Sequence, residues 1–203
     1  YMKFPFLREL GPQEGWYRVG PLARLAVCDR IATPEAEAAR VEFAEAMGGR
    51  PGTMSLAYHW ARMIETLSAI EEIERLLDDP DIEGDDLLRK GERRHESVGV
   101  IEAPRGTLFH HYVVADDDTV IRANLIVSTT SNNEPMNRAV ESVAKKFLTG
   151  TEITEGLLNR VEVAIRAYDP CLSCATHALG KMPLVIEIQD AGGRTLAEGK
   201  RNT

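Results

Sequence analysis

The sequence predicts a mainly α protein with β-hairpins, an α+β fold. Apolar residues recur at three- and four-residue steps over long stretches, whereas two Val- and Ile-rich stretches are each divided by a turn-forming cluster, at 116–118 and 192–193. The composition agrees, because 43% hydrophobic, 6% aromatic and 28% charged residues are ordinary for a globular, helix-rich protein. The 203 residues are enough for one well-buried domain or two small ones.

The first helix is predicted from Thr33 to about Met47. Thr33 offers a hydroxyl as the N-cap, and Pro34 stands in the first turn, where its missing N–H is not needed. Glu35 adds negative charge near the positive end of the helix dipole. The two glycines at 48–49 then end the helix.

A longer helix is predicted after the Pro-Gly pair at 51–52. Its apolar residues share one helical face. They are Trp60, Ile64, Leu67, Ile70, Ile73 and Leu77. The next segment, 78–96, is charged and broken by proline and glycine, so we expect a solvated excursion there.

Extended structure is predicted from Ser97 onward, where the sequence SVGVIEAPRGTLFHHYVVADDDTVIRANLIVST is rich in Val and Ile. The three aspartates at 116–118 lie between two extended runs. This pattern predicts a β-hairpin.

Two more helices and a second hairpin are predicted near the C-terminus. A helical pattern begins at 134–135 and ends at Gly150. The fourth helix is marked by Leu157, Val161, Ile165 and Tyr168. The Asp-Pro step at 169–170 should end it, because a residue before proline is pushed out of the α region. Finally, PLVIEIQDAGGRTLAEG is a strand-turn-strand pattern.

The charge balance excludes some classes of partner. With a net charge of −8 and a pI near 5.2, the chain has no excess of Lys or Arg to bind nucleic acid or an anionic membrane. No apolar run approaches the roughly 20 residues that span a bilayer, and no signal peptide is recognisable. We therefore expect a cytoplasmic protein. The start at Tyr1 suggests that an upstream portion is missing.

Two of the three cysteines lie in the stretch YDPCLSCATHALGKM. Cys171, Cys174 and His177 offer three soft or borderline metal ligands, one fewer than a closed zinc site needs. A covalent c-type haem would need His directly after the second cysteine, and an iron-sulfur cluster normally needs four cysteines. Spacing alone leaves open a structural zinc completed by His110 or His111, a redox pair, and a buried loop without a ligand.

The phrase DPCLSCATH resembles the C-terminal signature of the large, catalytic subunit of nickel-iron hydrogenases. The resemblance implies the helix-rich fold of that subunit's C-terminal part. It also implies that Cys171 is a terminal thiolate on nickel, that Cys174 bridges nickel and an iron carrying CO and cyanide, and that His177 binds magnesium. Soft thiolates suit nickel and low-valent iron.

Two further phrases resemble segments of the same family. EAPRGTLFHHY implies that Arg105 is a cation over the metals and that Pro104 packs against the diatomic ligands on iron. NLIVSTTSNNEPMN implies that Thr129 hydrogen-bonds an iron cyanide, although a strand end capped by hydroxyls is equally expected. The carbonyl of Leu125 would help to bind magnesium. Asp169 would accept a hydrogen bond from Arg105 and fix its position. Asp169 could also simply end the fourth helix, and both roles can hold together.

Within the family, the start and the tail of the chain most resemble the cytoplasmic, NAD-linked bidirectional hydrogenases. The deazaflavin-reducing and heterodisulfide-reductase-linked types are close competitors. The resemblance implies reversible oxidation of H2 to protons and electrons. The electrons would pass to an iron-sulfur small subunit, then through flavin/NAD diaphorase subunits to NAD.

The chain departs from the family in lacking the N-terminal cysteine pair, which the lone Cys28 cannot replace. Residues 1–177 therefore resemble the C-terminal part of a large subunit. In this family a dedicated endopeptidase cuts after the histidine of the signature once nickel is inserted. We thus expect 178–203 to be the uncut extension of an unprocessed precursor, with a terminal hairpin of the mature fold as the alternative. The fragment alone should hold no metal centre and be inactive.

Two other functions stay open. One is a non-catalytic helical module with a structural zinc at Cys171, Cys174 and His177. The other is a large-subunit relative that has lost hydrogenase chemistry, as in respiratory complexes. The intact cysteine pair counts against the second alternative.

Overall fold

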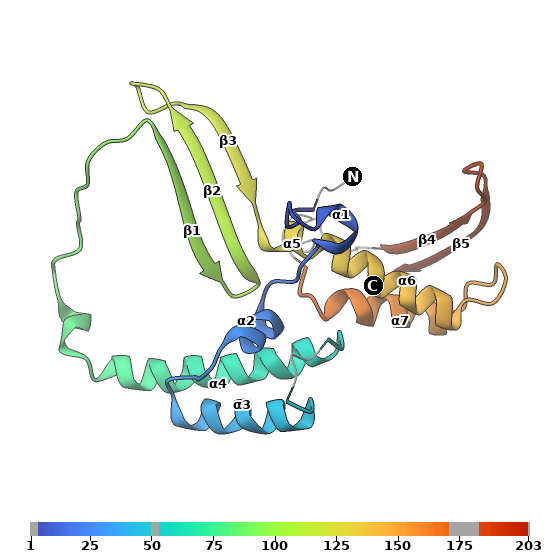
Figure 1. Ribbon diagram of the computed structural model, residues 1–203, viewed down its shortest axis with the longest axis horizontal. Coiled ribbons are helices and arrows are strands. Elements are labelled where there is room, and N and C mark those ends of the chain that lie inside the picture. Colours follow the sequence, from blue (N-terminus) through green and yellow to red (C-terminus); the bar gives the residue numbers. More distant parts are fainter. Residues whose placement is uncertain (1–3, 50–52, 171–182, 203) are drawn as a thin grey trace. The chain divides into compact units, whose positions relative to one another are not determined.

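The computed structural model describes residues 4–49, 53–170 and 183–202 (Figure 1). The chain forms two compact units, one made by residues 19–128 and the other by the segments on either side of them. We call the first the sheet unit and the second the hairpin unit. Helices and antiparallel strands occur in both, so the predicted α+β class is confirmed.

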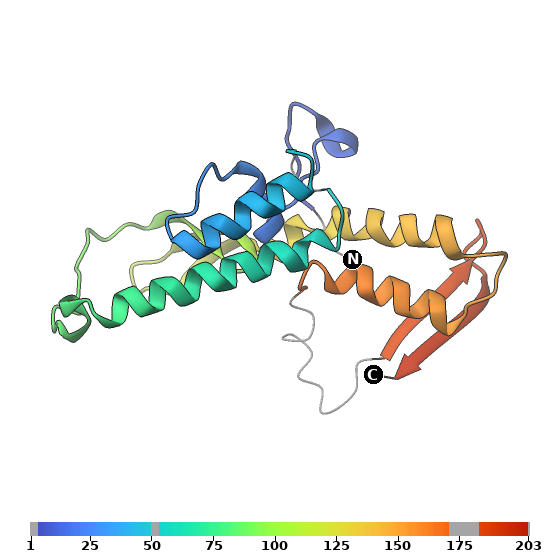
Figure 2. The same ribbon diagram turned by 90° about the horizontal axis from the view of Figure 1, so that it is seen from below.

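The sheet unit contains the helices α2 (Pro21–Val27), α3 (Pro34–Ala46) and α4 (Ala57–Leu77). Figure 2 shows α3 running beside α4, and α2 also packs against α4. Phe43 and Trp60 meet edge to face with ring centroids 5.2 Å apart, a favoured aromatic geometry. The predictions of α3 and α4 are confirmed, whereas α2 is too short to show a period.

The predicted apolar face of α4 is buried only over its N-terminal half in the described part of the chain. Ile64 is 2% exposed, but Ile70 and Ile73 are 57% exposed and Leu77 is 67% exposed. The buried hydrophobic side chains of the sheet unit are Val19, Leu22, Ala36, Phe43, Ala57, Tyr58, Ala61 and Ile64. The solvated excursion after α4 is confirmed. A short 3-10 helix, η1 (Pro80–Glu83), follows α4, and residues 84–94 are exposed and have no regular structure.

The first turn of α3 is capped by a distant carboxylate and not, as predicted, by the hydroxyl of Thr33. That hydroxyl donates to Oγ of Ser68 at 3.1 Å. The carboxylate of Glu71, on α4, accepts from the backbone N–H groups of Glu35 and Ala36 at 2.9 Å each. Desolvation raises the pKa of Glu71, but these hydrogen bonds outweigh it and lower the pKa below its ordinary value. The prediction was wrong because α4 supplies a better acceptor than the local hydroxyl.

Three antiparallel strands complete the sheet unit in the order β1 (Glu96–Ala103), β2 (Gly106–Val114) and β3 (Val120–Ile126). The predicted turn at 116–118 joins β2 to β3. A further turn at 104–105, which the prediction lacks, divides the first extended run. A three-stranded meander therefore replaces the single predicted hairpin.

The hairpin unit is built on α6 (Asn133–Phe147) and α7 (Glu155–Arg166), which pack side by side (Figure 2). Two short helices precede them, α1 (Gly11–Glu14) and α5 (Ser128–Ser131), the second at the border of the two units. The buried hydrophobic side chains are Met136, Leu157, Leu158, Val161, Ala164, Ala167 and Tyr168. Both long helices match their predictions. None of the helices in the described ranges is long and apolar enough to span a membrane.

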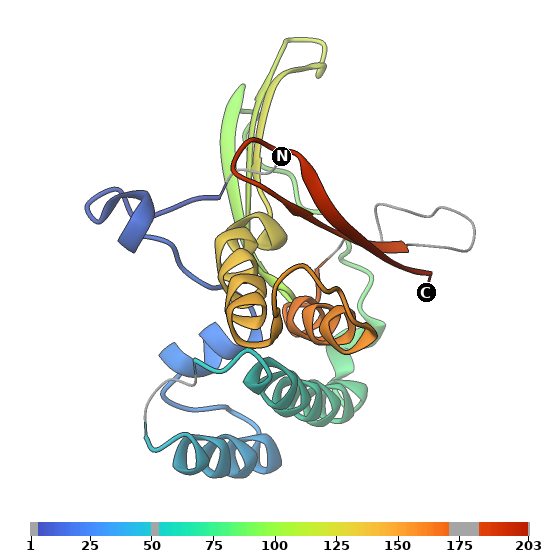
Figure 3. The same ribbon diagram turned by 90° about the vertical axis from the view of Figure 1, so that its right-hand side faces the viewer.

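The second predicted hairpin is also confirmed. Strands β4 (Pro183–Gln189) and β5 (Thr195–Asn202) pair antiparallel (Figure 3). Arg201 ties this hairpin to α7, since its Nη1 donates to Glu162 at 3.1 Å and to Asn159 at 3.4 Å.

Candidate functional site

The turn that carries Arg105 depends on close packing of two backbone segments. The register of β1 and β2 leaves only Pro104 and Arg105 between the strands. Gly106 has a φ of 135°, and a Cβ on it would lie 2.4 Å from Cγ2 of Val19. Gly20 has a φ of 97°, and a Cβ on it would lie 2.8 Å from the carbonyl oxygen of Arg105. Glycine is therefore required on both sides of this contact.

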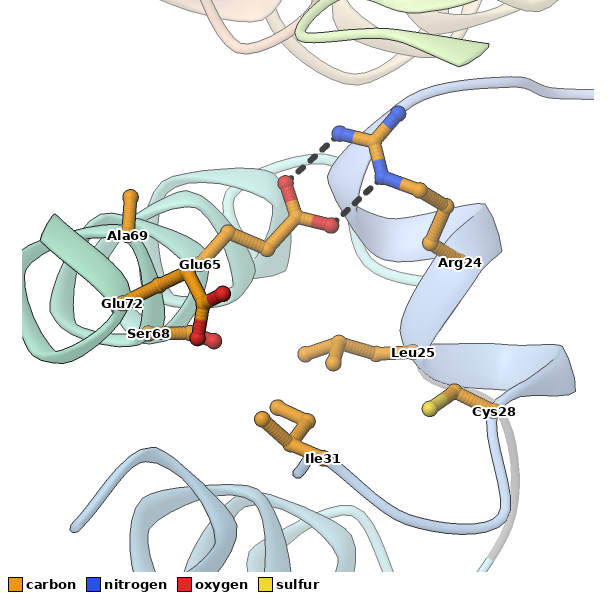
Figure 4. Close-up of a pocket in the computed structure, with 8 residues that line it drawn as sticks. All are labelled: Arg24, Leu25, Cys28, Ile31, Glu65, Ser68, Ala69 and Glu72. Carbon is orange, nitrogen blue, oxygen red and sulfur yellow. Dashed lines mark hydrogen bonds and ion pairs between the residues drawn. The ribbon is translucent and has the colours of Figure 1, made fainter. Parts of the chain in front are cut away.

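Arg24, on α2, holds the same turn from the side of the helices. Its Nη1 donates to the carbonyl of Ala103 at 3.0 Å, and its Nη2 donates to the carbonyl of Pro104 at 2.8 Å. Nη1 also donates to the carboxylate of Glu102. Glu65, on α4, accepts from Nε and Nη2 of Arg24 at 2.6 Å each, as Figure 4 shows. Arg24 thus joins α2, α4 and the end of β1.

The charge of Arg24 is compensated in this position. Burial lowers the pKa of Arg24, but hydrogen bonds with Glu65 and Glu102 outweigh burial and raise the pKa. The other oxygen of Glu102 accepts from the hydroxyl of Thr107 at 2.7 Å. The turn is therefore held by charge-assisted hydrogen bonds, which are stronger than neutral ones.

Arg105 itself is half-buried and lies in the turn, beside the exposed Pro104. The extended run predicted from Ser97 placed Arg105 inside an apolar strand. This was wrong, because residues 104–105 form a turn. The left-handed conformation of Gly106 reverses the chain direction there. The reversal presents Arg105 at a loop tip, where residues that contact a ligand are often found.

The remaining candidates within the described ranges are divided between the units. Leu125 lies on β3 opposite His110 and is 46% exposed. Thr129 lies in the short helix α5, not at the end of a strand, and is half-buried. Asp169 follows α7 with a φ of 50°, a conformation that Asp tolerates better than most residues. Pro104, Arg105 and Leu125 thus belong to the sheet unit, and Thr129 and Asp169 to the hairpin unit.

The segment with Cys171, Cys174 and His177 lies outside the described residues, but the chain just before it is firmly packed. Ala167 is 0% exposed and Tyr168 is 3% exposed. The hydroxyl of Tyr168 donates to a carbonyl of α6, that of Pro135, at 3.3 Å. The residues that directly follow α7 are therefore held against α6.

The described side chains do not by themselves make a metal site. No group of three or more His, Cys, Asp or Glu suited to a metal ion occurs among residues 4–49, 53–170 and 183–202. Nδ1 of His110 lies 3.0 Å from the hydroxyl of Tyr112, and Nε2 of His111 lies 2.8 Å from Oε1 of Glu96. The donor set that fits a soft metal is the thiol pair of the signature, whose chemistry suits nickel and iron.

A pocket of about 390 Å³ lies beside the pair of Arg24 and Glu65 (Figure 4). Leu25 and Ile31 line it, and so does Cys28, whose thiol donates to a backbone carbonyl at 3.0 Å. None of the predicted catalytic or metal-binding residues lines this pocket. We therefore do not assign the pocket to the H2 chemistry.

Sequence reasoning missed Arg24 and its partner Glu65. Nothing local distinguishes Arg24 from any other helical arginine, because its partners lie 41 to 80 residues away. One signal was available. Gly20 directly precedes the helix that carries Arg24 and Pro21 begins it, and a glycine before a proline at a helix start indicates a special backbone conformation.

Known proteins resemble the chain over most of its length. A family described as nickel-dependent hydrogenase matches residues 11–177. The beta subunit of the NAD-reducing hydrogenase HoxS of Cupriavidus necator is 52% identical over 99% of this chain. The iron-sulfur subunit of an F420-non-reducing hydrogenase of Archaeoglobus profundus is 43% identical over 97% of this chain. The chain spans 42% of the length of each of these two relatives.

Solved structures show the same relationship. An NAD+-reducing [NiFe]-hydrogenase in the H2-reduced state matches with a TM-score of 0.80 and 59% identity, over 87% of this chain and 39% of that one. A [NiFeSe] hydrogenase of Desulfovibrio vulgaris Hildenborough matches with a TM-score of 0.53 and 30% identity, over 79% of this chain and 35% of that one.

Proposed function

The chain belongs to the nickel-dependent hydrogenases, and from that premise we propose that it supplies the C-terminal part of a catalytic subunit that interconverts H2 with protons and electrons. The observation that carries the proposal is the family match over residues 11–177, which includes the thiol pair and Arg105. Because the chain spans less than half of its relatives, the activity is that of a larger assembly.

In this proposal the thiolates of Cys171 and Cys174 would hold a nickel-iron centre, and His177 and the carbonyl of Leu125 would bind magnesium. When bound, the nickel-iron centre, with CO and cyanide on the iron, supplies the coordination position and the redox change that H2 splitting requires. The support is chemical, because thiolates favour soft metals and a histidine and a carbonyl can bind a divalent cation.

The other side chains act around that centre. Arg105 places a permanent positive charge where charge develops during the reaction, and such preorganised charges contribute strongly to catalysis. Pro104 would pack against the diatomic ligands, and the hydroxyl of Thr129 would donate to a cyanide. Asp169 would orient Arg105 by accepting a hydrogen bond, and a thiolate of the cysteine pair would serve as the base that takes up a proton.

The physiological partners are proposed from the relatives. NAD is favoured as the electron acceptor, because the HoxS relative is NAD-reducing and shares 52% identity with this chain. Electrons would leave through an iron-sulfur small subunit to reach NAD through diaphorase subunits. A cytoplasmic location and the absence of nucleic-acid or membrane partners stay predictions of the sequence.

We further propose that 178–203 is an extension that a maturation endopeptidase removes after His177. The family match ends at residue 177, which supports this boundary. The 203-residue chain without its partners should show no H2-dependent activity. The zinc-module alternative gains no support, because the family match includes both cysteines and the histidine of the signature.

The proposal is tested in the complete enzyme that contains this chain. The parent enzyme should bind nickel and iron and reduce a dye with H2, whereas Cys171→Ser should lose nickel and activity together. Cys28→Ser is the matched control, because it removes a half-buried thiol that lies outside the signature. Stoichiometric zinc in place of nickel, or unchanged activity in Cys171→Ser, would contradict the proposal.

A further inference from the structure

Arg24 is the side chain through which the helices of the sheet unit reach the Arg105 turn. It lies on α2, only 24% of its side chain is exposed, and Figure 4 shows its guanidinium directed at the carboxylate of Glu65 on α4. The first half of α4 belongs to the buried core, where Tyr58 is 1% exposed and donates to the carbonyl of Val19. Arg24 therefore rests on the buried core of the unit.

The contacts of Arg24 fix the peptide groups that lead into Arg105. The carbonyl of Pro104 belongs to the peptide bond before Arg105, and it accepts from Nη2 of Arg24 at 2.8 Å. The carbonyl of Ala103 belongs to the preceding peptide bond, and it accepts from Nη1 at 3.0 Å. Two successive peptide planes are thus oriented by one planar guanidinium.

The peptide group after Arg105 is fixed from the other side. Its carbonyl oxygen lies so close to Gly20 that a Cβ there would be 2.8 Å away. With the peptide groups on both sides of Arg105 held, its φ and ψ are determined, and so is the direction in which its side chain leaves the backbone.

We propose that Arg24 is a positioning residue that sets the direction of the Arg105 side chain toward the reacting centre. The inference rests on the proposed function, because it assigns a task to Arg105. In this proposal Arg24 acts only through Arg105. Its charge is balanced by Glu65 and Glu102, so its effect is geometric.

The geometry requires arginine at position 24. A guanidinium presents several donors in one plane, and Arg24 uses three of its nitrogens to bond two carboxylates and two carbonyls. Lysine carries the same charge as a single point with rotatable donors and cannot reproduce that fork. Arg24→Lys should therefore keep the charge and lose the alignment.

The experiment compares Arg24→Lys, Arg24→Ala and Arg40→Ala in the complete, metal-loaded enzyme. Arg40 is the matched control, because it makes a bidentate pair with Glu37, its side chain is 17% exposed, and it lies on α3. The measurements are nickel and iron content, the infrared bands of CO and cyanide on the iron, and kcat and KM for H2.

We expect Arg24→Lys to retain its metals, to shift the infrared bands, and to lose roughly 10- to 100-fold in kcat with a smaller change in KM, as for a misaligned group. Arg24→Ala should show the same signature more strongly, and Arg40→Ala should match the parent. The double variant Arg24→Lys/Arg105→Ala should lose little more kcat than Arg105→Ala alone, because Arg24 acts through Arg105.

Unchanged bands and turnover in Arg24→Lys would overturn the inference. So would loss of metal from Arg24→Lys, or equal losses in Arg40→Ala, because both indicate a general structural role. The proposed function fails by a different result, a parent enzyme without nickel or H2-dependent activity, so the two failures are distinguishable.

Discussion

The turns of two hairpins in this molecule are built in opposite ways. The β1–β2 turn at 104–105 is held by residues far away in the sequence, through Arg24 and the close approach of Gly20. The β4–β5 turn is held by its own residues, since the carboxylate of Asp190 accepts from the backbone of Gly192 at 2.9 Å and of Arg194 at 3.0 Å. A turn that only reverses the chain needs local bonds. Long-range bonds fix, in addition, where the turn points.

The largest expected effect comes from filling the space at Gly106. Gly106→Ala forces a Cβ to within 2.4 Å of Val19 at a φ of 135°, and strain and overpacking together should cost about 3 kcal/mol. Gly193→Ala, in the β4–β5 turn, has a φ of 81° with nothing within 4 Å, so it should cost only about 1 kcal/mol. Denaturant unfolding measures both. Equal losses would mean that the two turns are packed alike.

A smaller loss is expected when Arg24 is deprived of its main partner. Glu65→Gln leaves a neutral amide facing a guanidinium that is only 24% exposed, and we expect a loss of about 2 kcal/mol, between exposed and buried pairs. Glu72→Gln is the control, because its partner Arg75 is 59% exposed and an exposed ion pair contributes little to stability. A cost for Glu72→Gln as large as that for Glu65→Gln would contradict the special role of the Arg24 pair.

The attachment of the C-terminal hairpin should be weaker still. Arg201→Ala removes bonds to Glu162 and Asn159, and global stability should fall by less than about 1 kcal/mol. Hydrogen exchange of the β4 and β5 amides should nevertheless become faster, because local opening needs less free energy. Arg194→Ala, which breaks only a bond inside its own turn, should leave exchange in the paired strands as it is. Unchanged exchange in both variants would show that Arg201 does not hold the hairpin.

The smallest effect depends on pH and concerns α3, which is not part of either turn. A hydrogen bond from Arg40, helped by one from the backbone of Ile31, lowers the pKa of Glu37 from 4.5 to about 2. The ionised carboxylate is favoured by folding, so its stabilisation is present above pH 4.5 and is lost as the pH falls toward about 2. Glu37→Gln should be less stable than the parent at pH 7, and the gap should close on acidification. A gap independent of pH would rule out this ionisation as its cause.

The sequence alone predicts those parts of the fold that depend on local pattern. The helices α3, α4, α6 and α7 and the β4–β5 hairpin follow from apolar spacing and from glycine and proline positions. Long-range contacts have no such signal. Thr33 looked like a cap, yet Glu71 caps the helix. The turn at 104–105 lies in a Val-rich stretch and was not predicted, because the residues that shape it lie far away in the sequence, near residues 20 and 24.

The candidate site divides in the same way. Arg105 and the signature cysteines were identified by resemblance to a family, and the family match confirms that resemblance. Their individual roles stay predictions. Arg24 could not be found in this way, because its importance depends on what it touches and not on its neighbours in the sequence.

The contact between Gly20 and Arg105 also bears on the order of folding. Strands β1 and β2 are adjacent in the sequence, so they can pair after closing a very short loop. Arg24 reaches the carbonyls of Ala103 and Pro104 only across separations of 79 and 80 residues, and closing such a loop costs more entropy and is slower. The hairpin can therefore form early, whereas the orientation of Arg105 is set only when α2 docks.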